Sequence, residues 1–387
     1  MLNILRSICS FLVSKILNSI SVGRVYNIDF LDSEKCNKRA AVCYITKPFL
    51  TKFDSPPHTS YNEVFNYVKV LNELGYIVDV FNYDDRLINI KVKGEYSYIF
   101  GFGKSFDKLV SENPTARNTM LLTESSPDFS IQEEKRRWES FESRKPNLSV
   151  PRLYRSGKFY SRSMIEQAES CLLIGNHTTV SSYRGYINEN EIYTIDATAL
   201  PTMNLPQKKD FSKAKKNFLW LGSGGAIHKG LDLLVDAFSS PLLKDCNLII
   251  CGAKDSEIKV FGRLPSNVKN FGFVNVNSEV FYSILEDTAF IILPSCSEGM
   301  STSVLTGIKH GLIPIITRET GVSCDDAVII DDLSISAIED KILEQSRRDD
   351  SILSSLSNKL LVENEYKYTK KNHYNSVRDK LRILLEN

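Results

Sequence analysis

The sequence predicts an α/β protein with two Rossmann-like, doubly wound domains that face a cleft. Short apolar segments of strand length alternate with amphipathic helical patterns, once before and once after a polar, lysine-rich stretch at residues 204–216. This alternation is typical of βα units, which build parallel sheets covered by helices on both faces. The chain has 387 residues, which is enough for two domains with large buried cores.

The composition excludes several classes of protein. Hydrophobic residues make up 42% of the chain and charged residues 25%, as in ordinary soluble proteins, and the net charge is only +1. So small a net charge gives no bulk attraction for nucleic acid, and we expect no such partner. The eight cysteines are scattered, without a C-x-x-C pair. We therefore expect buried thiols in a reducing, cytoplasmic compartment, and neither a disulfide framework nor a zinc site.

Residues 1–30 are predicted to form an amphipathic N-terminal helix. Apolar residues recur at helical spacing over Met1–Ile20, but Arg6 and Lys15 interrupt a run that is too broken for a transmembrane span or a signal-peptide core. Two interpretations fit: a helix packed on its own domain, or a helix lying on a membrane surface. The absence of any acidic residue before Asp29 favours membrane contact, with the protein peripheral at the inner face of the cell membrane.

The N-terminal domain is predicted at residues 38–203. Its expected strands are Ala40–Ile45, Ile77–Phe81, Tyr96–Phe100, Asn118–Leu122, Cys171–Ile174 and Ile192–Ile195. A helix that ends at Gly75 separates the first two strands, which gives βαβ order. The charged run Glu133–Arg137 is predicted to be a solvated helix face, with a role in acceptor binding as the alternative.

The C-terminal domain is predicted at residues 217–370, after a linker at 204–216. Its expected strands are Phe218–Leu221, Leu248–Cys251, Val268–Phe271, Phe290–Leu293 and Ile313–Ile316. They alternate with helical patterns, which predicts a second doubly wound sheet. The last helix, within residues 371–387, is predicted to return to the N-terminal domain.

Glycine-rich turns follow two of the predicted strands, and neither fits a dinucleotide-binding fingerprint. That fingerprint needs a third glycine at Phe106 for the turn that starts at Gly101, and at Ile227 for the turn that starts at Gly222. A Walker phosphate loop would need a glycine at Tyr98. The sequence therefore argues against a dehydrogenase and against a Walker-type nucleotide site.

The turn at Gly222–Gly225 is predicted to hold a phosphate. It leads to Lys229-Gly230 at the start of a predicted helix. Backbone amides and a lysine at a helix start attract an anion, whereas the helix dipole disfavours a lysine that has no anion beside it. We expect Lys229 to bind the phosphates of a nucleotide, with Ser223 and His228 beside it; the alternative is an ordinary surface lysine.

A second turn, after the strand Phe290–Leu293, carries Glu298 and Gly299. Ligands of open α/β sheets sit at the carboxyl ends of the strands, where a carboxylate suits sugar hydroxyls. The plain alternative is an acidic residue that the helix start favours. The residues Met300–Val304 offer amides and hydroxyls to the same ligand. The two turns together predict a nucleotide-sugar pocket.

His58 lies at the end of the loop after the first strand, in the expected cleft. It is a candidate acceptor-side base or sugar contact; the alternative is a loop histidine with its hydrogen bonds satisfied. No group of His, Asp and Glu has the spacing of metal ligands, so we expect no metal, no cofactor and a metal-independent mechanism.

At these residues the sequence resembles the GT-B glycosyltransferases of the retaining family 4, the group 1 glycosyl transferases. The resemblance is carried by FLWLGSGGAIHKGLDLLVDAF from Phe218, FGFV from Phe271 and PSCSEGMSTSVLTGIKHGLIPIIT from Pro294. It implies that the second domain binds a nucleotide diphosphate sugar and the first a glycan or lipid-linked acceptor. Lys229 falls on the family's diphosphate-binding lysine. Glu298 falls on the first glutamate of its Glu–seven residues–Glu motif, which contacts the donor sugar.

Two positions depart from the family pattern. Thr306 stands where the second glutamate usually holds the ribose, and Ser223 stands where an arginine usually partners the lysine. Both changes weaken the expected binding, because a charge-assisted hydrogen bond contributes about 1.5–3 kcal/mol. A degenerate, non-catalytic protein that supports a partner enzyme is therefore the alternative function. A third hypothesis, sugar-nucleotide epimerisation, lacks identifiable acid–base groups around the sugar.

The resemblance thus predicts a retaining, hexosyltransferase-like glycosyltransferase of cell-surface polysaccharide biosynthesis. Lys229 and Glu298 are the expected catalytic residues, and His58 is the expected acceptor-side residue. The expected donor-binding residues are Gly222, Ser223, Gly224, Gly225, His228, Lys229, Glu298, Gly299, Met300, Ser301, Thr302 and Thr306.

Overall fold

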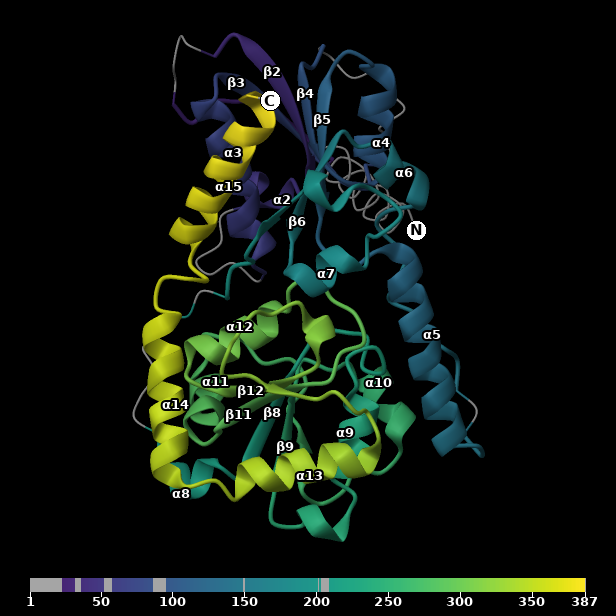
Figure 1. Cartoon of the computed structure of the whole chain (residues 1–387), viewed down its shortest axis with the longest axis vertical. Helices are drawn as coiled ribbons and strands as arrows, with labels where there is room; N and C mark the ends of the chain where they lie inside the picture. The colour runs from purple at the N-terminus through teal and green to yellow at the C-terminus, as the bar shows by residue number, and fades with distance from the viewer. Residues whose placement is uncertain are drawn as a thin grey trace, which may run out of the picture.

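The computed structural model places two sheet domains one above the other, with the N-terminal domain at the top of Figure 1. The structure describes residues 23–31, 36–51, 58–85, 95–148, 150–200, 202 and 209–386. The helix predicted over Met1–Ile20 and the first part of the predicted linker lie outside these ranges. Membrane contact through residues 1–20 therefore stays a prediction.

The N-terminal sheet has the strand order β1-β3-β2-β4-β5-β6-β7. Its strands are β1 (Arg24–Ile28), β2 (Lys38–Tyr44), β3 (Tyr76–Asn82), β4 (Tyr98–Gly101), β5 (Arg117–Leu122), β6 (Ser170–Ile174) and β7 (Ile192–Ile195). Every neighbouring pair is parallel except β1 with β3. The residues Ala40–Tyr44 of β2 are all buried, as expected for an apolar strand that helices cover on both faces.

Residues 24–28 form a strand, so the prediction of a helix over residues 1–30 is wrong for this part. β1 pairs antiparallel with β3, with Arg24 opposite Phe81. Asn27 has a left-handed backbone (φ 56°), and its amide donates to Asp79 Oδ1 at 2.7 Å. The segment Arg-Val-Tyr-Asn-Ile is rich in strand formers, and pairing at the free edge of the sheet decides its conformation.

The C-terminal sheet is parallel throughout, with the strand order β10-β9-β8-β11-β12-β13. Its strands are β8 (Asn217–Leu221), β9 (Asn247–Cys251), β10 (Val268–Asn270), β11 (Phe290–Leu293), β12 (Ile313–Ile316) and β13 (Val328–Ile329). This order is that of a doubly wound nucleotide-binding fold, which reverses direction between β8 and β11. The predicted α/β class with two such domains is confirmed.

Helices cover both sheets. Those of the N-terminal domain are α2 (Lys47–Leu50), α3 (Ser60–Glu73), α4 (Gly103–Glu112), α5 (Pro127–Arg144), α6 (Arg162–Glu166), α7 (His177–Ser181) and η1 (Glu189–Glu191). The next part of the chain forms α8 (Phe211–Ala214), α9 (Leu231–Ala237), η2 (Pro241–Leu243), α10 (Asp255–Ile258), η3 (Lys259–Phe261), α11 (Glu279–Glu286), α12 (Thr302–Lys309) and η4 (Arg318–Thr320). The last helices are α13 (Ile335–Ser346), α14 (Asp350–Glu363) and α15 (Lys370–Glu386).

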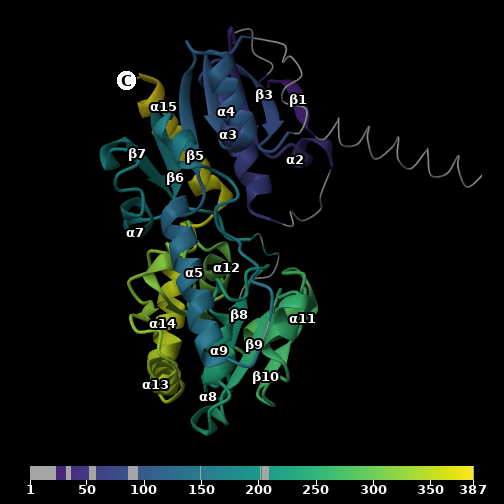
Figure 2. The same ribbon diagram turned by 90° about the vertical axis from the view of Figure 1, so that its right-hand side faces the viewer.

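The end of the chain crosses from one domain to the other. Helix α14 packs against α12 and β12 of the C-terminal domain, whereas α15 packs against α3 and β7 of the N-terminal domain. Figures 1 and 2 show this yellow segment running upward along one side of the molecule. On α15, His373 is buried, and its Nδ1 lies 2.9 Å from Nδ2 of Asn66 on α3. The last helix therefore completes the N-terminal domain.

Helix α5 links the domains in the opposite direction. It starts in the N-terminal domain and descends beside the C-terminal domain (Figure 1), where Arg144 forms ion pairs with Asp232 and Asp236 of α9. The prediction of a solvated face at 133–137 is wrong for two of its residues: Glu134 is 0% exposed and Arg137 5%. Together with the buried Trp138 and Phe141 they recur at helical spacing, and this face packs between the domains.

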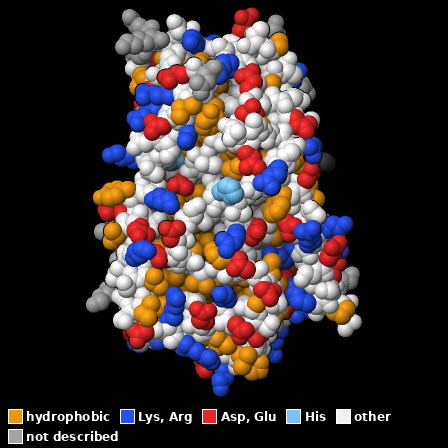
Figure 3. Space-filling view, in the orientation of Figure 1, with side chains coloured by type: hydrophobic (Ala, Val, Ile, Leu, Met, Phe, Trp, Pro, Cys, Tyr) orange, Lys and Arg blue, Asp and Glu red, His pale blue; other side chains and the backbone are white. Residues whose placement is uncertain are grey.

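The face shown in Figure 3 carries basic and acidic side chains interspersed, without a broad patch of one sign. This agrees with the net charge of +1. Among the described residues, no helix combines the length and apolar character that crossing a bilayer requires.

Candidate functional site

A cavity of about 490 Å³ lies between the domains, at the carboxyl ends of strands of both sheets. The strand order of the C-terminal sheet reverses between β8 and β11, and that of the N-terminal sheet between β2 and β4. Ligands of open α/β sheets bind outside the carboxyl ends of the strands at such switch points. Both sheets therefore direct their ligand-binding loops into one cavity, and its volume suits a small molecule.

The two domains contribute different chemistry to this cavity. From the N-terminal domain it is lined by Tyr44, Ile45, His58, Thr59, Ser60, Glu63, Tyr83, Phe102, Thr123, Glu124, Arg155, Phe159, Ile174, Ala197 and Leu200. From the C-terminal domain it is lined by Leu221, Gly222, Ser223, Lys229, Gly252, Phe273, Val274, Asn275, Val276, Glu298, Gly299, Met300, Ser301, Thr302 and Ser303. The first set is rich in aromatic rings, and the second in glycine and hydroxyl groups.

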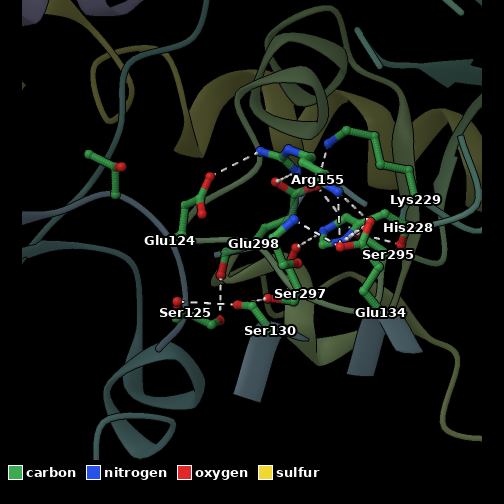
Figure 4. A network of polar contacts seen from close by, with 12 residues as sticks. Glu124, Ser125, Ser130, Glu134, Arg155, His228, Lys229, Ser295, Ser297 and Glu298 are labelled. Atoms are coloured by element: carbon green, nitrogen blue, oxygen red, sulfur yellow. Dashed lines mark hydrogen bonds and ion pairs between the residues drawn. The ribbon is translucent and has the colours of Figure 1, made fainter. Parts of the chain in front are cut away.

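Lys229 and Glu298 meet in the cavity as an ion pair (Figure 4). They follow β8 and β11, the two strands that flank the switch point, so that separate turns converge on one place. Lys229 is 7% exposed and Glu298 6%. Ser295 Oγ donates to Glu298 Oε1 at 3.1 Å, and the Trp220 indole donates to the Lys229 carbonyl at 3.3 Å. The expected lysine and carboxylate thus lie in contact with each other.

Arg155 is the third charged member of the site, and sequence reasoning missed it. It lies on the loop between α5 and α6, in the N-terminal domain, and its Nη1 donates to Glu298 Oε2 at 3.0 Å. Its Nη2 lies 3.6 Å from Glu124 Oε1. Neither its spacing nor its neighbours in the sequence mark Arg155, because the contact joins positions 143 residues apart. Only the apposition of the two domains reveals it.

Burial and neighbouring charges act on these groups in opposite senses. Burial raises the pKa of Glu298, but Arg155, Lys229 and His228 outweigh it and hold that pKa well below its ordinary value. Glu298 and Glu124 raise the pKa of Arg155. Burial lowers the pKa of Lys229, and Glu298 counteracts this. The site therefore holds two cations around one ionised carboxylate.

His228 lies behind this cluster and does not line the cavity. Its two ring nitrogens face two acceptors: Nε2 bonds the Ser297 carbonyl, and Nδ1 lies 3.5 Å from Glu134 Oε1. Although burial lowers the pKa of His228, the Cys296 thiol and Glu134 raise it to about 9. Two acceptors at two nitrogens fit an imidazolium, which donates at both. His228 thus links Glu134 of the N-terminal domain to the Ser297 carbonyl of the C-terminal domain. It does not line the cavity in which a phosphate would bind.

The predicted glycine turn divides into two parts. Gly222 and Ser223 line the cavity, whereas Gly224 and Gly225 do not. The amide of Gly225 donates to Glu257 Oε1 at 2.6 Å, and that of Ala226 donates to the same oxygen at 3.0 Å. A carboxylate of the protein itself therefore occupies the Gly225 amide, one of those that the sequence assigned to a phosphate.

The residues after Glu298 also divide. Gly299, Met300, Ser301 and Thr302 line the cavity as expected. Thr306 does not: it is 0% exposed, its Oγ1 donates to the Thr302 carbonyl at 2.8 Å, and it accepts from the Leu200 amide at 3.1 Å. Its hydroxyl therefore bonds within α12 and to the end of the N-terminal domain, and not to a ligand in the cavity.

His58 lines the N-terminal side of the cavity. Its Nδ1 accepts from the Ser60 amide at 3.2 Å, so the proton of the neutral ring resides on Nε2. Burial and the Arg155 guanidinium lower its pKa, which favours this neutral form. Nearby, the buried Glu63 accepts from the Tyr44 hydroxyl at 3.1 Å, and burial raises its pKa. Sequence reasoning missed Glu63, which the helical pattern of α3 does not distinguish from a surface acid.

The two domains approach each other closely at Gly299. A Cβ atom at this position would lie 2.2 Å from the Thr123 carbonyl oxygen and 2.8 Å from that of Ile174, both in the N-terminal domain. The Gly299 carbonyl accepts from Thr179 Oγ1 at 2.9 Å, which holds the contact from the other side. Only glycine fits between these backbones.

We expect Gly299→Ala to destabilise the contact between the two domains, because the backbone atoms of Thr123 and Ile174 cannot move aside as side chains do. Overpacking of this kind costs about 1–3 kcal/mol, and urea denaturation of the variant and the parent would measure it. Small-angle scattering of the variant is expected to show separated domains. An unchanged free energy of unfolding with an unchanged radius of gyration would contradict this account.

Within the described ranges, no group of three or more His, Cys, Asp or Glu side chains is arranged to hold a metal ion. The described cysteines are all free thiols.

Comparison with known proteins finds similarity to glycosyltransferases. The sequence model of the family Glycosyl transferases group 1 matches residues 215–346. The glycogen synthase of Erwinia tasmaniensis is 30% identical over 132 residues, which are 33% of this chain and 27% of that enzyme. The chain thus matches about a quarter of the length of this curated relative.

Solved structures extend the likeness to both domains. The sucrose-phosphate synthase of Thermosynechococcus elongatus superposes with a TM-score of 0.60 at 11% identity, over 90% of this chain and 100% of that one. HepE of Anabaena, solved in complex with UDP and glucose, superposes with a TM-score of 0.56 at 12% identity, over 89% of this chain and 100% of that one. At such identities the likeness shows the fold.

The architecture is therefore that of a GT-B protein: two doubly wound domains with a ligand cavity between their strand ends. Within this class, residues 215–346 match the group 1 glycosyl transferases. The predicted fold and the predicted resemblance to the group 1 glycosyl transferases are confirmed.

Proposed function

We propose that the protein is a retaining glycosyltransferase that moves a sugar from a nucleotide diphosphate donor to a glycan or lipid-linked acceptor. The observation that carries this proposal is the meeting of Lys229 and Glu298 in the interdomain cavity, at the switch point of the C-terminal sheet. A buried ammonium suits a diphosphate, and a carboxylate suits sugar hydroxyls. The match to the group 1 glycosyl transferases supports the same assignment.

In the proposed reaction, the bond between the anomeric carbon and the diphosphate oxygen breaks. The acceptor oxygen bonds to the same face of that carbon, and the acceptor proton leaves on the diphosphate. Lys229 stabilises the negative charge that develops on the leaving diphosphate, and Glu298 orients the donor sugar. No step of this scheme requires a metal ion, because Lys229 supplies positive charge at the leaving group.

The acceptor belongs on the N-terminal side of the cavity. Aromatic rings of Tyr83, Phe102 and Phe159 pack together there, with ring centroids 5.3–5.9 Å apart. Such rings offer flat apolar faces, which suit the apolar face of a sugar ring. His58 donates from Nε2 to an acceptor hydroxyl in this arrangement. A glycan of the cell surface is the acceptor class that we propose, with polysaccharide biosynthesis as the pathway.

The first experiment is a thermal-shift screen of the full chain against UDP, ADP and GDP and their glucose and N-acetylglucosamine conjugates. UDP comes first because HepE, which shares the fold, was solved with UDP and glucose. A stabilising nucleotide sugar is then incubated with oligosaccharide acceptors, and NMR of the product is expected to show the anomeric configuration of the donor. Inversion of that configuration would overturn the retaining assignment.

The second candidate function is a non-catalytic GT-B protein that supports a partner enzyme. Thr306 favours it, because the position that the family uses for the ribose is sealed between α12 and Leu200. If no nucleotide diphosphate or nucleotide sugar shifts the melting temperature, the catalytic proposal fails and this second function takes its place.

A further inference from the structure

We propose that Arg155, from the N-terminal domain, supplies the second cation for the diphosphate of the donor. This inference rests on the proposed function and adds to it the residue that replaces an arginine of the C-terminal domain. Both domains then contribute to the anion site, Lys229 from the C-terminal domain and Arg155 from the N-terminal domain.

The C-terminal domain by itself offers little positive charge at this place. The resemblance to the group 1 glycosyl transferases implies an arginine beside the lysine, and Ser223 stands at that position. Two amides of the turn, those of Gly225 and Ala226, already bond to Glu257 at 2.6 and 3.0 Å. Of the donors predicted there, Lys229 remains as the cation, and one ammonium is a poor match for a diphosphate.

The geometry brings Arg155 to the missing position. Glu298 receives the Lys229 ammonium on Oε1 and the Arg155 guanidinium on Oε2, the latter at 3.0 Å. One carboxylate therefore spans two cations from different domains, as Figure 4 shows. Two phosphate groups joined by one oxygen are larger than a carboxylate and carry more acceptor oxygens, so both cations lie within reach of the same anion.

The structure also holds Arg155 in place from behind. Its amide donates to Glu134 Oε1 at 2.8 Å, and the next amide, of Ser156, donates to Glu134 Oε2 at 2.8 Å. A Cβ atom on Gly225 would lie 3.1 Å from Arg155 Cδ, so the side chain rests directly on the glycine turn. The Arg155 side chain keeps 32% of its surface exposed, towards the cavity that it lines.

The donor then acts by exchange. A bound diphosphate takes over the cations that Glu298 now pairs, and the freed carboxylate becomes available to the sugar hydroxyls. In the absence of donor, Glu298 occupies the anion's place. Because one cation belongs to each domain, the diphosphate itself ties the domains together.

The test measures binding of UDP, ADP, GDP and inorganic pyrophosphate by isothermal titration calorimetry, on the full chain and on Arg155→Ala. Loss of one charge-assisted contact is expected to weaken both pyrophosphate and the preferred nucleotide about ten- to a hundredfold. Arg155→Lys, which keeps the charge but not the planar fork, is expected to lie in between. Ser223→Arg in the Arg155→Ala background is expected to restore most of the lost affinity.

Arg152→Ala is the matched control, because Arg152 lies on the same loop and pairs with Glu142 at the surface. Its affinities are expected to equal those of the parent. If Arg155→Ala binds pyrophosphate and nucleotide as tightly as the parent does, while Lys229→Ala loses both, Arg155 is only a counter-ion of Glu298 and the inference is overturned. If the parent itself binds none of the four probes, the proposed function fails, and the inference falls with it.

Discussion

Lys229→Ala is expected to lower kcat/KM for sugar transfer by a hundredfold or more while the chain stays folded. Lys229 provides a buried ammonium at the carboxyl end of β8, where the leaving diphosphate develops charge. Removal of a single preorganised group that stabilises such charge typically costs about 10²–10³ in rate. In the folded variant, Glu298 keeps Arg155 and Ser295 as partners, so the carboxylate is not left unpaired. Initial-rate measurements with the donor found by the thermal-shift screen would test this.

Lys244→Ala removes an exposed lysine of the same domain and serves as the control, with parental kinetics expected. Glu298→Gln completes the set: the amide keeps the shape but loses the charge, so a raised KM for the nucleotide sugar is expected together with a lower kcat. Parental turnover in Lys229→Ala would remove this site from the reaction.

Glu134→Ala is expected to lower the free energy of unfolding by about 3–5 kcal/mol, the usual cost of leaving a buried charge without its partner. Glu134 is 0% exposed, and it accepts the amides of Arg155 and Ser156 while it faces the His228 ring. Its loss removes the acceptor of both amides and the carboxylate beside His228 Nδ1. Chemical denaturation with two probes would measure the change. The exposed Glu139 on the same helix is the control, and its alanine variant is expected to differ from the parent by about 0.5 kcal/mol or less.

The pair of His228 and Glu134 makes the free energy of unfolding depend on pH in two defined ranges. The His228 pKa of about 9 lies above its unfolded value of about 6.5, so its contribution is complete below pH 6.5 and disappears as the pH rises to 9. Hydrogen bonds from His228 and from the backbone lower the pKa of Glu134 to about 2 despite burial, so its contribution is lost only as the pH falls below about 4.5 towards 2. Parental stability is therefore expected to decline between pH 6.5 and 9. In Glu134→Ala that decline should be shallower; an equal decline in both proteins would exclude the pair as its cause.

The sequence predicted those features that depend on local pattern. Apolar runs such as Phe290–Leu293 and the glycine-marked turns after them locate the strand ends, and parallel sheets bring strand ends together. Lys229 and Glu298 were found for this reason. Strand β1 was missed because pairing at a sheet edge decides it more than its own pattern does.

The contacts that form only where the two domains meet could not be predicted from local sequence pattern. Arg155 and Glu134 belong to a polar segment whose periodicity fits a solvated helix and loop equally well. Their role appears only once Glu134 faces His228 and Arg155 faces Glu298, contacts that span 94 and 143 residues. The hydrogen bond from the Gly225 amide to Glu257 could not be predicted either, since no spacing rule connects positions 225 and 257.

The return of α15 to the N-terminal domain has a consequence for biosynthesis. Helix α3 precedes the second domain in the sequence and α15 follows it, yet the two pack together, with His373 enclosed beside Asn66 and Tyr67. During translation, we therefore expect the surface of α3 and β7 that α15 covers to stay exposed until the second domain has been made. A cut at residues 204–216 would therefore leave the first domain without α15, the helix that packs on its α3 and β7.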